Sequence, residues 1–139
     1  MSDTFFANGK KLILGPLLGK GAEGAVYNIS ASSDIAVKIY NDGKALERHE
    51  KVVAMVSAGL SSTSTYVAYP LEVVTRQNGA FAGFTMKKAA GFKTVHDLYG
   101  PGSRRAEFPT ADVRFLVRAA YNLSAAIASI HKSGCVVGD

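Results

Sequence analysis

The sequence has few of the features that mark secreted, membrane-spanning or fibrous proteins. Its 139 residues include one cysteine, four prolines and no tryptophan. A single cysteine, Cys135, excludes an intramolecular disulfide and suits a reducing compartment. No apolar run approaches the roughly 18 residues that span a bilayer, and the first residues lack the basic and apolar segments of a signal peptide. We therefore expect a cytoplasmic protein with no membrane partner.

The charge and composition exclude further classes. Lysine and arginine number 16 and aspartate and glutamate 11, so the formal net charge is +5 at pH 7. Spread over the whole chain, this charge favours a solvated surface over a nucleic-acid site. The hydrophobic content of 47% is that of a globular protein and excludes collagen-like, coiled-coil and disordered chains.

The pattern between residues 11 and 88 predicts five strands and one helix in the order βββαββ. Gln77-Asn-Gly79 is a hairpin signal between the last two strands. The expected strands cover residues 12–18, 25–29, 35–40, 66–75 and 80–86, and the helix covers 44–57. Apolar residues at helical spacing predict a buried stripe of Leu46, Val53 and Val56, with Ala45 and Val52 beside it.

Residues 89–139 have a different pattern. We expect a hinge near Ala89, a loop over residues 100–109, and a long helix from Ala111 to Lys132 that is capped by Thr110. Gly134 would end the helix, and a short strand would cover 135–137. Because the helix is apolar over a wide arc, it needs packing partners that the remaining sequence does not supply. The chain is therefore expected to be truncated, with an α+β fold divided into residues 1–88 and 89–139.

A glycine-rich segment, Gly19-Lys-Gly21-Ala-Glu-Gly24-Ala-Val26, matches the pattern G-x-G-x-x-G-x-V. Glycines let backbone N–H groups approach phosphate oxygens with no Cβ in the way. A dinucleotide-binding loop would open a helix, but residues 25–29 favour a strand. A Walker A loop would end in Gly-Lys-Ser/Thr, which this segment lacks. The context therefore favours a glycine-rich hairpin folded over ATP.

Such a hairpin requires a lysine on the next strand, and Ile35-Ala-Val-Lys38 supplies it. A lysine inside an apolar strand costs desolvation free energy unless an anion pairs with it. Val26 and Ala36 are suited to hold an adenine between them. The alternative interpretation is a tight glycine turn beside an edge-strand lysine.

These residues resemble the protein kinase family, whose glycine-rich loop and V-A-I-K strand they match. The resemblance implies a kinase N-lobe followed by the beginning of a C-lobe. It also implies that Lys38 orients the α and β phosphates of ATP and is held by a glutamate on the following helix. Helical spacing favours Glu50, on the flank of the apolar stripe, over Glu47, which points to solvent.

The resemblance also implies the other residues of the site. Met86 would be the gatekeeper, and the backbone of Lys87 and Ala89 would meet the adenine edge. Asp139 would accept the proton of the substrate hydroxyl. The implied nucleotide-binding residues are Gly19, Lys20, Gly21, Ala22, Glu23, Gly24, Val26, Ala36, Lys38, Met86, Lys87 and Ala89, and no metal ligand is expected among the 139 residues.

Two departures from the family limit the expected activity. Val137-Gly138 replaces the usual His-Arg before the catalytic aspartate. The asparagine and aspartate that hold Mg²⁺ in the family would lie beyond Asp139. The resemblance therefore implies the ATP-binding part of a serine/threonine-type protein kinase that is inactive as this chain alone, while its parent uses ATP and Mg²⁺ on an unknown protein substrate.

A narrower resemblance is carried by four stretches, 18–27, 36–40, 99–109 and 137–139. They are similar to bacterial kinase-like proteins that carry a helix-hairpin-helix DNA-binding region, so any nucleic-acid contact would lie in a missing C-terminal region. The alternative function is a nucleotide-binding pseudokinase or scaffold module of a larger nucleic-acid-associated regulator.

Overall fold

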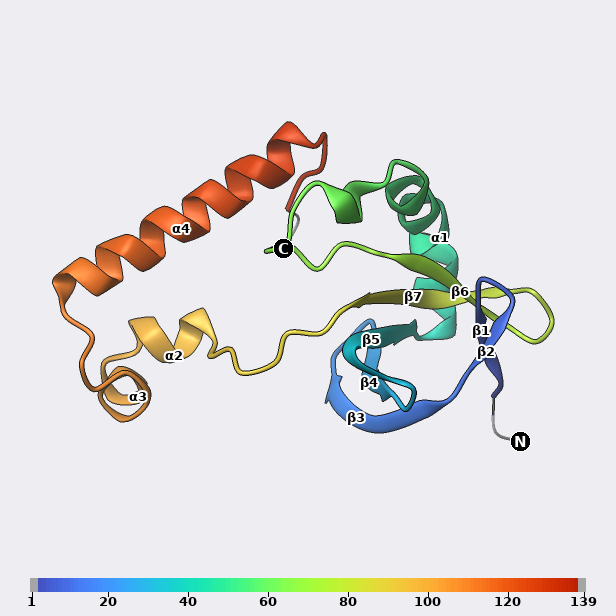
Figure 1. Ribbon diagram of the computed structural model, residues 1–139, viewed down its shortest axis with the longest axis horizontal. Coiled ribbons are helices and arrows are strands. Elements are labelled where there is room, and N and C mark those ends of the chain that lie inside the picture. Colours follow the sequence, from blue (N-terminus) through green and yellow to red (C-terminus); the bar gives the residue numbers. More distant parts are fainter. Residues whose placement is uncertain (1–2, 138–139) are drawn as a thin grey trace. The chain divides into compact units, whose positions relative to one another are not determined.

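The computed structural model describes residues 3–137. They form two compact units that are divided between Lys88 and Ala89. The first unit contains a sheet with a helix packed against it, and the second is helical (Figure 1). The first unit consists of β1 (Phe5–Ala7), β2 (Lys10–Leu12), β3 (Leu14–Lys20), β4 (Gly24–Ile29), β5 (Ser32–Tyr40), α1 (Asp42–Ser57), a 3-10 turn (Leu60–Ser62), β6 (Glu72–Arg76) and β7 (Phe81–Lys87).

The seven strands form one antiparallel sheet in the order β2-β1-β6-β7-β5-β4-β3. The prediction of an α+β fold is confirmed, but the prediction of five strands is wrong. The two additional strands are the hairpin of β1 and β2. Asn8 and Gly9 connect them with φ angles of 46° and 75°, the positive values that a type I′ hairpin turn requires.

The sheet buries apolar side chains on both faces. One face carries a core cluster of Phe5, Ala7, Ile29, Val37, Val74 and Ala82. On the other face, Tyr40 and Phe84 pack with Ala45 and Val52 of α1. The strand β5 therefore contributes to both layers, and alternate residues along it face opposite sides of the sheet.

The buried side of α1 differs from the one expected. Ala45 and Val52 are buried, whereas Leu46 is 83% exposed and Val53 is 37% exposed. The prediction was wrong by about one residue, which is about 100° around a helix. The helix approaches the rings of Tyr40 and Phe84 through the small side chain of Ala45, so the more apolar stripe lies to one side of the contact.

The hairpin of β6 and β7 is confirmed at Gln77-Asn-Gly79, where Gly79 has a φ of 82°. However, β6 begins only at Glu72, six residues after the expected start. Pro70 precedes it and has no N–H group for a sheet ladder. The chain before it is irregular apart from the 3-10 turn.

The second unit contains α2 (Val95–Tyr99), α3 (Pro101–Glu107) and α4 (Val113–Lys132). The loop expected over residues 100–109 is wrong, because Pro101 begins a helix at the position where its missing N–H costs nothing. Thr110 is not the cap of the long helix. Asp112 caps it and accepts a hydrogen bond of 2.9 Å from the backbone N–H of Phe115. Gly134, with a φ of 78°, follows the end of α4 as expected, and residues 135–137 form no strand.

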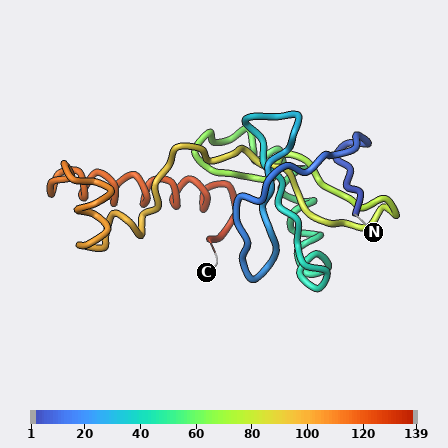
Figure 2. The backbone as a smooth tube through the Cα atoms, turned by 90° about the horizontal axis from the view of Figure 1, so that it is seen from below, coloured from blue at the N-terminus to red at the C-terminus, as the bar shows by residue number. Residues whose placement is uncertain are grey.

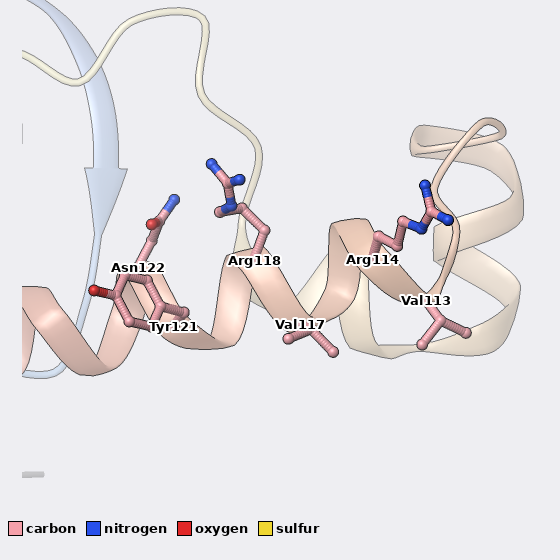
Figure 3. Close-up of a pocket in the computed structure, with 6 residues that line it drawn as sticks. All are labelled: Val113, Arg114, Val117, Arg118, Tyr121 and Asn122. Atoms are coloured by element: carbon pink, nitrogen blue, oxygen red, sulfur yellow. The ribbon is translucent and has the colours of Figure 1, made fainter.

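The helix α4 keeps much of its apolar surface exposed within its unit, including Val113, Val117 and Tyr121. A shallow hollow runs along it, and Figure 3 shows its lining residues, Val113, Arg114, Val117, Arg118, Tyr121 and Asn122. None of the expected site residues lies in this hollow. Among the helices of residues 3–137, none combines the length and the apolar character needed to cross a membrane.

Candidate functional site

The register of the sheet brings four expected site residues to one face. Val26 on β4 lies opposite Lys38 on β5, and Ala36 on β5 lies opposite Met86 on β7. Directly opposed residues of an antiparallel pair point to the same side, as do alternate residues of one strand. Val26, Ala36, Lys38 and Met86 therefore share the sheet face on which α1 packs, and this face forms the base of the candidate site.

The glycine-rich segment connects β3 and β4 as a narrow loop (Figure 2). The N–H of Gly21 donates to the carbonyl of Gly24 over 2.9 Å and closes the turn. Asn41, the residue before α1, fastens the loop to the start of the helix. Its backbone N–H donates to the Glu23 carbonyl and its side-chain amide to the Ala22 carbonyl, each over 2.9 Å.

Sequence reasoning missed this role of Asn41 and read it only as the end of a strand. An asparagine before a helix is normally expected to cap it with its side chain. Here the side chain makes no capping bond, because its amide is directed to the loop. The sequence shows a polar residue at the start of the helix, but nothing in it indicates that Asn41 binds the distant Ala22 carbonyl.

The three glycines of the motif have different surroundings. A Cβ on Gly24 would overlap the carbonyl oxygen of Ile39 and lie 2.8 Å from the Cα of Tyr40. A Cβ on Gly19 or Gly21 would meet no atom within 4 Å. The fold therefore requires a glycine at position 24, whereas positions 19 and 21 leave open space over the loop backbone.

The ammonium group of Lys38 lies beside a carboxylate and an aromatic ring. Its Nζ is 3.6 Å from Oε2 of Glu23 and 4.8 Å from the centre of the Tyr40 ring. The other oxygen of Glu23, Oε1, accepts a hydrogen bond of 2.7 Å from Arg48 on α1. Glu23 is thus the anion that offsets the desolvation of Lys38, and it comes from the glycine-rich loop.

The charges around Glu23 stabilise one another. The hydrogen bond from Arg48, and to a smaller extent the charge of Lys38, lowers the pKa of Glu23. The same hydrogen bond raises the pKa of Arg48. Burial, followed by the charge of Glu23, raises the pKa of Tyr40. At neutral pH Glu23 is therefore a carboxylate that Arg48 holds, and Tyr40 is a neutral phenol.

The ion pairs continue along α1. Oε1 of Glu47 lies 3.1 Å from Arg48, and its Oε2 lies 2.6 Å from Lys44. The hydrogen bond from Lys44 is the main cause of the lowered pKa of Glu47. Glu50 is exposed, and over residues 3–137 it forms no ion pair. The pairing of Lys38 with Glu50 stays a prediction.

The remaining expected residues lie around this face or outside it. Lys20 and Ala22 are exposed on the loop, and Lys87 is exposed at the end of β7. Ala89 belongs to the second unit. Asp139 lies outside the described residues.

The arrangement can bind an anion beside an apolar group. Lys38 supplies a cation, Gly19 and Gly21 leave the loop backbone open, and Val26 supplies a partly buried apolar side chain on the same face, near the buried Ala36. Between residues 3 and 137 there is no cluster of three or more His, Cys, Asp or Glu side chains placed to hold a metal ion.

Comparison with known proteins finds two similar proteins that are both named protein kinase YegI. Protein kinase YegI of Escherichia coli strain K12 is 35% identical to this chain over 137 residues, which cover 98% of the chain and 21% of that protein. The protein of the same name from Escherichia coli O157:H7 is 34% identical over 141 residues, covering 100% of the chain and 22% of the relative. The chain thus spans about a fifth of the length of these relatives. No family model matches the chain. These similarities support a kinase-like relationship.

Proposed function

We propose that this chain is the ATP-binding part of a protein kinase that transfers the γ-phosphate of ATP to a serine or threonine hydroxyl of a protein. The observation that carries the proposal is the position of Lys38. Its ammonium group lies beside the glycine-rich loop and on the same sheet face as Val26 and Ala36. The similarity to proteins named protein kinase over the full chain supports it.

In this proposal each part of the face has a separate task. The backbone N–H groups at Gly19 and Gly21 would contact phosphate oxygens, since no Cβ blocks their approach. Lys38 would bind the α and β phosphates. Val26, Ala36 and Met86 would contact the adenine ring, because the register places them on one face. The backbone of Lys87 and Ala89 would bind the adenine edge.

The chemical step belongs to the longer parent protein in this proposal. Asp139 would position the hydroxyl nucleophile there. Phosphoryl transfer also requires Mg²⁺ to neutralise charge on the phosphates, but the described residues do not form a site for it. The isolated chain is therefore expected to bind ATP without transferring phosphate.

The decisive experiment is calorimetric titration of ATP into the chain and into a Lys38→Met variant. Charge-assisted hydrogen bonds contribute about 1.5–3 kcal/mol, so the variant should bind ATP at least roughly tenfold more weakly. Lys51→Met removes an exposed lysine of α1 and serves as the matched control. Equal affinity of wild type and Lys38→Met would contradict the proposal.

The transfer reaction is tested in the parent protein. We expect radiolabelled ATP to label protein serine or threonine, and Asp139→Asn to abolish the labelling. ATP binding that depends on Lys38 without any transfer by the parent would support the alternative of a nucleotide-binding scaffold.

A further inference from the structure

The carboxylate of Glu23 lies between two cations that hold it unequally. Oε1 is 2.7 Å from Arg48, within the range of a strong charge-assisted hydrogen bond. Oε2 is 3.6 Å from Lys38, beyond hydrogen-bond range, so this second contact is a looser electrostatic one. The guanidinium group of Arg48 is therefore the main partner of Glu23.

Arg48 faces this carboxylate because of its place on α1. It lies three residues after Ala45 and four before Val52, the two buried residues of the helix. Residues at this spacing share one side of a helix. A second carboxylate, that of Glu47, lies 3.1 Å from the same guanidinium group.

We propose that Arg48 is a positioning residue of the nucleotide site, which holds the Glu23 carboxylate toward α1 and so leaves the Lys38 ammonium group available to phosphate. This inference rests on the proposed function. Phosphate and carboxylate oxygens are acceptors of the same kind, so the two groups compete for one ammonium group. A planar guanidinium matches a carboxylate better than a compact ammonium does. The pair of Arg48 and Glu23 therefore keeps the carboxylate out of hydrogen-bond range of Lys38, with Oε2 3.6 Å from Nζ.

Without Arg48, Glu23 would keep Lys38 as its cation, and ATP would have to displace it. The hydrogen bonds from Asn41 to the Ala22 and Glu23 carbonyls would hold the loop in place, so the carboxylate would remain within reach of Lys38. Removal of Arg48 should thus weaken ATP binding although Arg48 itself does not contact ATP.

A double-variant cycle separates this role from a structural one. Arg48→Met removes the charge and keeps an unbranched apolar side chain, and Glu23→Gln removes the competing charge and keeps the backbone contacts to Asn41. Calorimetric ATP affinity is measured for the wild type, both single variants and the double variant, with Lys51→Met as the charge-matched control on the same helix. Circular dichroism melting verifies that each variant is folded.

The proposal predicts a specific order of affinities. Arg48→Met should weaken ATP binding by roughly threefold or more, because groups in one ion-pair network couple measurably. Glu23→Gln should bind ATP more tightly than the wild type, because the competing charge is removed, and the double variant should bind like Glu23→Gln. Lys51→Met should bind like the wild type. If Arg48 only stabilised the fold, removing the charge of Glu23 would not restore affinity.

The outcomes distinguish this inference from the proposed function. If the wild type binds ATP through Lys38 and Arg48→Met binds ATP equally well, the inference about Arg48 is wrong while the proposed function stands. Equal losses in Arg48→Met and in the double variant would also overturn the inference. Absence of ATP binding by the folded wild type would overturn both. If Arg48→Met does not fold, the double variant carries the test, because the inference requires it to match Glu23→Gln.

Discussion

Gly24 and Gly19 belong to one motif, but the structure predicts opposite effects when each is replaced by alanine. At Gly24, the new Cβ would overlap the Ile39 carbonyl and lie 2.8 Å from the Cα of Tyr40. Both are backbone atoms of β5, so no side-chain rotation relieves the overlap. The strands β4 and β5 would have to separate where Gly24 pairs with Tyr40.

The cost follows from this geometry. Overpacking typically costs about 1–3 kcal/mol, and each weakened ladder hydrogen bond adds about 0.5–1.5 kcal/mol. We therefore expect Gly24→Ala to lower the free energy of unfolding by at least about 2 kcal/mol. For a unit of the size of residues 1–88, which contains both strands, each kcal/mol lowers the melting temperature by roughly 4–8 °C. Circular dichroism melting of the chain measures the shift.

Gly19→Ala is the matched control. Its Cβ would meet nothing within 4 Å, so stability should stay within about 0.5 kcal/mol of the wild type. ATP affinity should nevertheless fall, because the methyl group would stand over the loop backbone proposed to contact phosphate. Two results would refute the reasoning: wild-type stability of Gly24→Ala, or a comparable loss of stability in Gly19→Ala.

Three further predictions concern the loop and α1. Asn41→Ala removes the amide donor to the Ala22 carbonyl and should cost about 1 kcal/mol in urea unfolding; no loss would show that this bond does not stabilise the loop. The hydrogen bonds that lower the pKa values of Glu23 and Glu47 stabilise the fold above the ordinary glutamate pKa. That stability is lost as the pH falls through the lowered pKa values, so the melting temperature should decrease at pH values below about 4. A Glu23→Gln/Glu47→Gln variant should show a smaller decrease. An equally steep decrease in this variant would show that the two glutamates are not the cause. If the ion pairs of this structure persist when ATP is bound, Glu50→Gln should leave the ATP affinity unchanged. A loss of ATP affinity as large as that of Lys38→Met would instead support the pairing of Glu50 with Lys38.

Local patterns predicted those parts of the sheet that local chemistry determines. The turn at Gln77-Asn-Gly79 was predicted, and the structure contains this hairpin. The prediction succeeds because the residues that specify the turn are the residues that form it. The same kind of signal, Asn8-Gly9, was missed. The strands beside it have only three residues each, too few to show a period of two. Pairing with β6, about seventy residues along the chain, supports β1, and no local pattern shows such a contact.

The orientation of α1 shows a second limit. Apolar spacing identified the helix but selected the wrong side, since it weights Leu46 and Val53 above Ala45. The contact with Tyr40 and Phe84 favours the smaller side chain because it lets the helix approach closely. Which side of an apolar stripe meets a sheet depends on the shape of the sheet, and the sequence of the helix does not contain that information.

The ionic partners of Lys38 follow from that orientation. The sequence predicted an anion for Lys38, and the structure supplies one, but from the loop and not from the helix. With Ala45 and Val52 buried, the side of α1 that faces the loop carries Arg48, a cation that binds the loop carboxylate. Glu50 lies two residues further along, about 200° away around the helix. With Ala45 and Val52 in the core, Glu50 is exposed on the side of α1 away from Arg48. The buried face of α1 therefore decides that Arg48, and not Glu50, faces the glycine-rich loop, where it holds the Glu23 carboxylate beside Lys38.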